Sequence, residues 1–126
     1  MFIVKINHIF LGDFFMTLIY TLCALLILGM GVLHVAITKK VYKKLSLDAM
    51  WFSAGGFTLI LASFINLIYI SVNNGNLLII IFCYVANLGL ILFLSLLLKV
   101  FRQPHVIFLF CLALLQLGLF VFLQLT

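Results

Sequence analysis

Four long apolar segments, separated by short polar connections, constrain what this chain of 126 residues can fold into. The segments cover about residues 14–38, 51–72, 77–100 and 106–125. A helix needs about 20 mostly apolar residues to cross the hydrocarbon core of a bilayer, and each segment reaches that length. The sequence therefore predicts an all-α integral membrane protein with four transmembrane helices, in which residues 1–126 form a single membrane domain.

The composition agrees with a membrane fold and limits where a site can lie. Hydrophobic residues make up 68% of the chain and charged residues 7%, whereas a soluble domain is about half apolar. Because four spanning helices use most of the chain, a binding site has to lie inside the bundle or at its rims. The formal net charge of +5 is explained by loops that border anionic lipid headgroups. We therefore expect the lipid bilayer, and not a nucleic acid, as the partner of these charges.

The basic residues alternate between the connections. Six of the seven Lys and Arg residues flank the first and third connections, and the second connection has none. These six are Lys39, Lys40, Lys43, Lys44, Lys99 and Arg102. Because cytoplasmic loops collect Lys and Arg, the pattern places the Lys-rich loop 39–44 in the cytoplasm and both termini on the extracytoplasmic side. Short connections between the helices predict antiparallel neighbours and hence an up-down bundle.

Local signals mark the predicted helix ends. Ser46 can cap the second helix, and Asp48 in its first turn complements the positive end of the helix dipole. The stretch 73–75, Asn-Asn-Gly, tolerates the left-handed backbone that a tight turn needs. Pro104, the only proline, suits the first turn of the fourth helix, where its missing N–H does no harm.

Neutral polar side chains recur inside the predicted spans, whereas carboxylates lie only at their boundaries. Intramembrane carboxylates commonly mark proton relays and cation coupling, so we do not expect a carboxylate-driven antiporter. The neutral candidates are Tyr20, Asn66, Tyr84, Asn87 and Gln116. They lie at a similar depth, about 9–15 Å from the outer boundary. Such residues can hold helices together by hydrogen bonds, or they can line an outward-facing polar cavity for a small ligand or a permeating solute.

A second candidate site lies at the cytoplasmic rim and comprises His34, Trp51 and His105. His34 lies just inside the end of the first predicted helix and His105 begins the fourth, so both are on the same side of the membrane. Haem or metal ligation would need facing rings at equal depth and hydrogen-bonded supporting residues. Because no motif surrounds these histidines, we expect no cofactor and no metal ion.

The segment from His34 to Asn66 is the least generic part of the chain. In order it contains His34, Thr38, Tyr42, Lys43, Lys44, Leu47, Asp48, Trp51, Phe52, Gly55, Gly56 and Asn66. This pattern, which covers the first two predicted helices, resembles small four-helix membrane proteins of bacteria. The resemblance implies a bacterial inner-membrane location and no particular activity.

The sequence favours a non-catalytic role. It has no Ser-His-Asp set, no paired carboxylates and no metal-binding spacing, so we do not expect an enzyme. The apolar surface and the 14 Phe residues offer large areas for lipid or protein contact. We therefore expect an accessory subunit or a homo-oligomeric scaffold, associated with copies of itself or with another membrane protein. The alternative is a subunit of a small-solute transporter or channel that uses the neutral polar residues.

Overall fold

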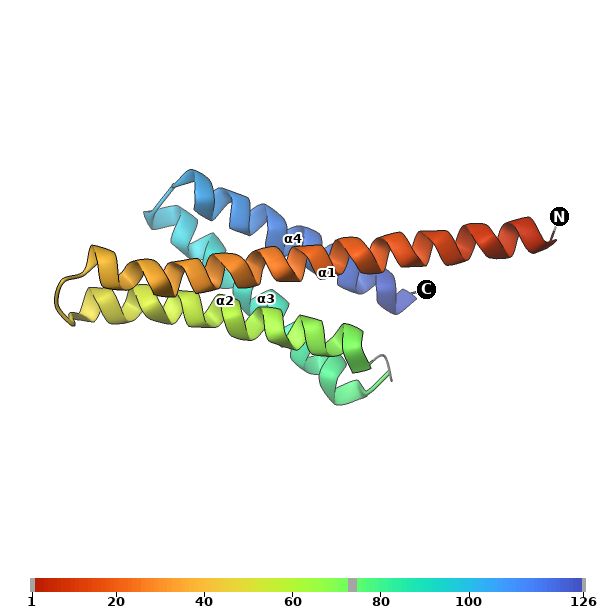
Figure 1. Ribbon diagram of the computed structural model, residues 1–126, viewed down its shortest axis with the longest axis horizontal. Helices are drawn as coiled ribbons and strands as arrows, with labels where there is room; N and C mark the ends of the chain where they lie inside the picture. Colours follow the sequence, from red (N-terminus) through yellow and green to blue (C-terminus); the bar gives the residue numbers. More distant parts are fainter. Residues whose placement is uncertain (1, 73–74, 126) are drawn as a thin grey trace.

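The computed structural model describes residues 2–72 and 75–125, and the side chains from Leu11 onward. Within these ranges all regular secondary structure is α-helical (Figure 1). The helices are α1 (Phe2–Val41), α2 (Leu47–Val72), α3 (Leu77–Val100) and α4 (Pro104–Leu125). Each contains a stretch that is long and apolar enough to cross a membrane, as predicted, and in α1 this stretch is Leu11–Val41.

The four helices form two antiparallel hairpins. α1 and α2 lie side by side, and the pair formed by α3 and α4 crosses them at an angle (Figure 1). Contacts between the hairpins join α1 to α4 and α2 to α3. The α1–α2 and α3–α4 connections lie at one end of the molecule, which we call the basic end because it carries residues 39–44 and 99–102.

Three helices start before the predicted spans, and for α4 the difference is only from residue 106 to Pro104. α1 begins at Phe2 and not near residue 14, because the segment before the first apolar run contains no proline that would interrupt its backbone hydrogen bonds. α2 begins at Leu47 and not at residue 51. The predicted cap explains this earlier start, because the N–H of Ala49 donates to Ser46 Oγ at 3.2 Å.

The remaining connections follow their local sequence. Asn76 caps α3 by accepting a hydrogen bond from the N–H of Leu78 at 2.9 Å. Gly75 has a φ of 59°, a left-handed conformation that costs glycine little. The other two residues of the predicted turn, 73–74, lie outside the described residues. Pro104 occupies the first turn of α4, as predicted.

α1 and α2 approach each other closely at two glycines. A Cβ added to Gly31 would lie 2.8 Å from the Gly56 carbonyl oxygen and 3.0 Å from the backbone nitrogen of Ile60. A Cβ added to Gly56 would lie 2.9 Å from the Gly31 carbonyl oxygen. Small residues let membrane helices pack backbone to backbone, and we call this pair the glycine contact.

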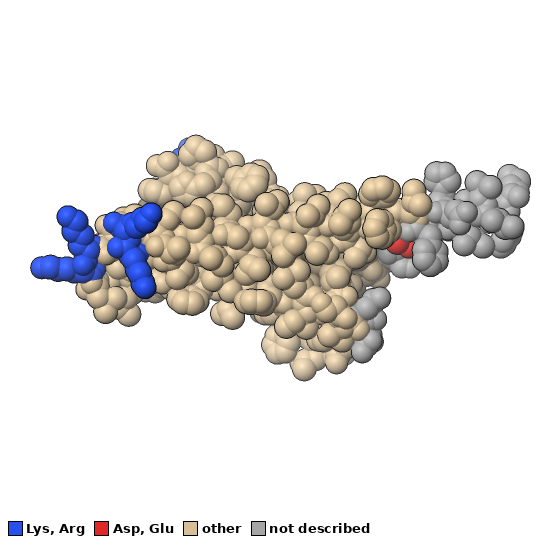
Figure 2. Space-filling view, in the orientation of Figure 1, with Lys and Arg blue, Asp and Glu red and all other residues tan. Residues whose placement is uncertain are grey.

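The buried core lies between the hairpins, and the outer surface is apolar. On the face shown in Figure 2, the Lys and Arg side chains gather at the basic end and leave the body of the molecule without them. Large apolar side chains such as Leu22, Leu61 and Val85 are at least half exposed in the middle of their helices. Lipid solvates a surface of this kind, whereas water does not.

The glycine contact predicts a stability loss for Gly31→Ala. The new methyl group would meet backbone atoms of α2, so the helices would have to separate, at a cost of about 1–3 kcal/mol. The free energy of unfolding, measured by titration with a denaturing detergent in mixed micelles, should fall accordingly. The matched control is Gly29→Ala, where a Cβ meets nothing within 4 Å. Equal stability of the two variants would contradict the role of the glycine contact.

Candidate functional site

Three of the predicted polar residues form a hydrogen-bonded cluster that joins three helices. The Tyr20 hydroxyl of α1 donates to Asn66 Oδ1 of α2. Asn66 Nδ2 donates to Asn87 Oδ1 of α3 at 3.1 Å, and Asn87 Nδ2 donates back to Asn66 Oδ1 at 2.9 Å. We call these three residues the amide cluster.

The amide cluster is closed to the surroundings of the protein. Each of its side chains is at most 2% exposed. Asn66 Nδ2 also donates to the carbonyl oxygen of Ala62, one turn earlier, at 2.7 Å. A buried amide without partners is costly in an apolar medium, and here the amides satisfy one another. The geometry therefore suits helix association and leaves no open polar surface at these residues.

The other two predicted residues lie beside the cluster without joining its hydrogen bonds. Gln116 of α4 is completely buried, and neither atom of its amide makes a hydrogen bond with the described residues. The amide still interacts electrostatically with the Tyr20 hydroxyl. The half-buried Tyr84 ring of α3 meets the Phe120 ring edge-on, with centroids 4.8 Å apart. The structure thus groups the predicted residues in one region, although only three of them bond directly.

Sequence reasoning missed a second polar pair in this region. Gln124 Nε2 of α4 donates to the Tyr69 hydroxyl of α2, and the Tyr69 ring packs edge-on against Tyr20. Helical spacing holds a signal for both residues. Tyr69 follows Asn66 by three positions and Gln124 follows Gln116 by eight, which are spacings that share one side of a helix.

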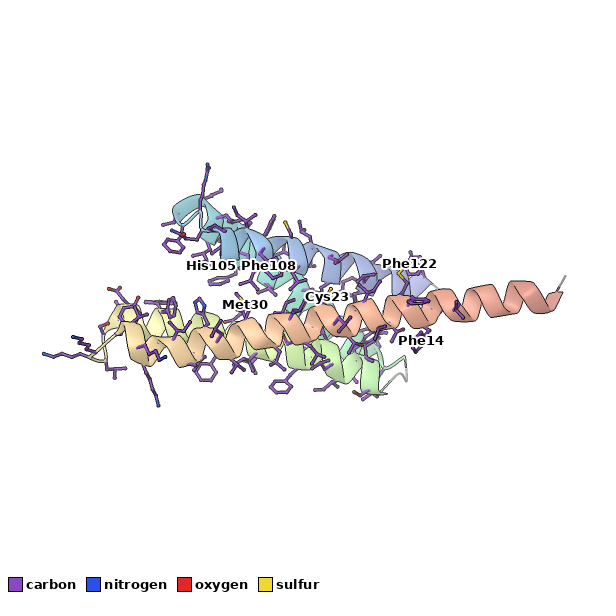
Figure 3. All side chains as sticks on the ribbon, turned by 45° about the horizontal axis from the view of Figure 1, so that its top comes forward. Phe14, Cys23, Met30, His105, Phe108 and Phe122 are labelled. Carbon is purple, nitrogen blue, oxygen red and sulfur yellow. The ribbon has the colours of Figure 1, made fainter. Side chains whose placement is uncertain are left out.

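The predicted rim residues His34, Trp51 and His105 line one cavity of about 620 Å³ at the basic end. All four helices contribute to its walls, and we call it the rim cavity. The other lining residues are Tyr42, Asp48, Phe52, Gly55, Leu59, Phe93, Leu94, Leu97, Val100, Phe101, Val106 and Leu109. Figure 3 shows His105 at the start of α4, on the hairpin across from α1 and α2.

Aromatic contacts position the two histidines of the rim cavity. The His34 ring stacks on the Phe52 ring, with centroids 3.9 Å apart and an angle of 17° between the planes. The His105 ring meets the Phe101 ring edge-on at 6.2 Å, and the two imidazoles interact electrostatically. Among the described residues, no group of three His, Cys, Asp or Glu side chains is arranged to hold a metal ion. The lining suits an organic molecule better than an ion.

Comparisons with protein-family models, with curated proteins and with solved structures find no match for this chain. Functional reasoning therefore starts from the two features that the fold builds. The amide cluster holds helices together, and the rim cavity has the size and lining to receive a small molecule.

The amide cluster predicts an energetic coupling between Asn66 and Asn87. Replacing either with Leu leaves the other amide buried with fewer partners, so each single variant should lose about 1–3 kcal/mol of unfolding free energy. The double variant Asn66→Leu/Asn87→Leu should lose less than the sum, by about 0.6–2 kcal/mol. The same detergent titration measures all three variants.

Thr58→Val is the control for this cycle, because the Thr58 hydroxyl is exposed and donates only to Ala54 of its own helix. It should stay close to the parent chain in stability. Strict additivity of the Asn66 and Asn87 effects would show that the two amides do not support each other.

Proposed function

We propose that this chain is a non-catalytic integral membrane protein that serves as an accessory subunit or as a homo-oligomeric scaffold. The amide cluster is the observation that carries the proposal. Its three polar side chains are buried and bonded to one another, so they serve cohesion within the bundle. What the chain presents to its surroundings is mainly an apolar surface.

Aromatic side chains on that surface support association with another membrane protein or another copy. Phe14, Phe15, Phe57, Phe64 and Phe82 are between 50% and 65% exposed, and they are distributed over α1, α2 and α3. Phenylalanine offers a large contact area and favourable ring–ring geometries. Helix association in lipid depends on such packing contacts.

A subunit of a small-solute transporter or channel is the second candidate, and Gln116 is the observation that favours it. Its buried amide makes no hydrogen bond with the described residues and lies beside the amide cluster. An amide in this state can accept a polar partner that enters the bundle at this depth. Transport would require the helices around Gln116 to separate.

We also propose a bacterial inner-membrane location, with the loop 39–44 in the cytoplasm and both termini extracytoplasmic. The gathering of Lys side chains at one end supports this orientation (Figure 2), because positively charged loops are retained in the cytoplasm. The choice of a bacterial inner membrane rests on the sequence pattern of residues 34–66 alone.

The experiment that tests the proposed function is native mass spectrometry of the chain after gentle extraction from the membranes that express it. We expect a defined complex, either with another membrane protein in fixed stoichiometry or with further copies of this chain. The variant Phe57→Ala/Phe64→Ala should weaken that complex, because both rings lie on the exposed face of α2. The matched control is Leu22→Ala on the exposed face of α1.

A chain that stays monomeric and without a partner in native-like membranes would overturn the proposal. The transport alternative has its own test in the triple variant Asn66→Leu/Asn87→Leu/Gln116→Leu. If solute flux into vesicles occurs with the parent chain and persists in this variant, the polar residues do not form a transport site.

A further inference from the structure

We propose that the rim cavity binds an anionic phospholipid of the leaflet at the basic end. One acyl chain would enter the apolar depth of the cavity, and the headgroup phosphate would lie at its mouth. The inference goes beyond the proposed function, because it requires neither a partner subunit nor transport.

The depth of the rim cavity matches an acyl chain. Leu59, Leu94 and Leu109 form its inner wall and are each at most 3% exposed. At a rise of about 1.5 Å per residue, Leu59 lies about 18 Å inside α2, and the other two lie about 8–9 Å inside their helices. An apolar chain that reaches Leu94 and Leu109 stays within one half of the hydrocarbon core, which is about 15 Å thick, and Leu59 lies near the midplane.

The mouth of the rim cavity is rich in hydrogen-bond donors. Tyr42, Trp51 and His105 lie there, within about one turn of a helix end, whereas His34 lies deeper, about two turns inside α1 and at a depth similar to that of Leu94 and Leu109. Each of these side chains can donate a hydrogen bond, whereas Asp48 is the only carboxylate in the lining. Within the described part of the chain, none of these five side chains forms a hydrogen bond. A phosphate, which offers several acceptor oxygens, complements this set of donors.

The charge around the mouth favours an anionic headgroup over a zwitterionic one. The α1–α2 connection, which contributes Tyr42 to the lining, also carries Lys43 and Lys44, and Lys39 and Lys40 lie in the last turn of α1. Figure 2 shows Lys and Arg side chains grouped at the basic end. Clusters of Lys beside a membrane span attract anionic lipids, and basic pockets between helices bind their headgroups.

The bilayer is the natural source of this ligand. The cavity lies between two hairpins whose outer surfaces are apolar, so a lipid can enter from the side with its headgroup already at the interface. Its volume of about 620 Å³ falls within the range of about 300–1,000 Å³ typical of ligand sites. This space suits one chain better than a whole phospholipid, so the second chain would remain in the surrounding lipid.

Trp51 provides the measurement, because it is the only tryptophan in the chain and lines the cavity. The full chain is reconstituted in phosphatidylcholine vesicles that contain increasing fractions of phosphatidylglycerol with brominated acyl chains, and Trp51 fluorescence is recorded. Brominated phosphatidylcholine is the reference quencher. We expect saturating quenching by the anionic lipid, with half-saturation at a mole fraction about tenfold lower than for the zwitterionic lipid.

Gly55→Leu tests whether this preference depends on the cavity. Gly55 lines the cavity, and a Cβ added there meets only the Phe93 ring at 3.9 Å, so a side chain can start there without a backbone clash and occupy the cavity. The preference for the anionic lipid should disappear in this variant. It should persist in the matched control Gly89→Leu, on the exposed side of α3, where a Cβ meets nothing within 4 Å.

Three outcomes would overturn the proposal. Equal quenching by the two lipids would remove the headgroup preference, and quenching that rises linearly with mole fraction would indicate bulk lipid contact. An anionic preference that survives in well-folded Gly55→Leu would assign the effect to the Lys residues alone. The first two outcomes are read from the parent chain, so they do not depend on the folding of any variant.

Discussion

Helices inside a bilayer gain no hydrophobic free energy by packing against one another, because the lipid around them is as apolar as their own side chains. Close backbone packing and buried hydrogen bonds have to supply the cohesion. The described residues of this chain provide both. The glycine contact joins α1 to α2 through backbone atoms, and the amide cluster joins α1, α2 and α3 through side chains.

The placement of these two contacts explains why the rim cavity exists where it does. The amide cluster connects the hairpins far from the basic end, since Tyr20 lies about 31 Å along α1 from Val41. The glycine contact lies nearer to the basic end, but it acts within the first hairpin. Toward the basic end, rings such as Phe52, Phe93 and Phe101 stand between the crossing hairpins. The two hairpins are thus hydrogen-bonded to each other in the half away from the basic end, and they enclose the rim cavity in the half near it.

Hydropathy and loop charge were sufficient to predict four helices of spanning length and the grouping of the Lys residues. The rise per residue was sufficient to group Asn66 and Asn87 at one depth, because depth depends only on position along a helix. Which polar atoms bond depends also on the rotation of each helix, and spans that are apolar on all sides carry little information about rotation. For this reason the sequence could not show that Asn87, and not Gln116, forms the hydrogen bonds with Asn66. It also did not predict the hydrogen bond between Gln124 and Tyr69. The sequence placed His34 and His105 on the same side of the membrane, but it could not show that the residues around them enclose a cavity.

The distribution of the amide cluster between the hairpins has a consequence for how the protein is made. Tyr20 and Asn66 both belong to the first hairpin, so their hydrogen bond can form as soon as α1 and α2 have entered the bilayer. Asn87 and Gln116 belong to the second hairpin, and neither bonds to the other in the described structure. In a newly inserted second hairpin the Asn87 amide therefore lies in hydrocarbon, which is unfavourable until it meets Asn66 of α2. The reciprocal hydrogen bonds between Asn66 and Asn87 favour association of the second hairpin with the first, and they fix the register in which the two hairpins pack.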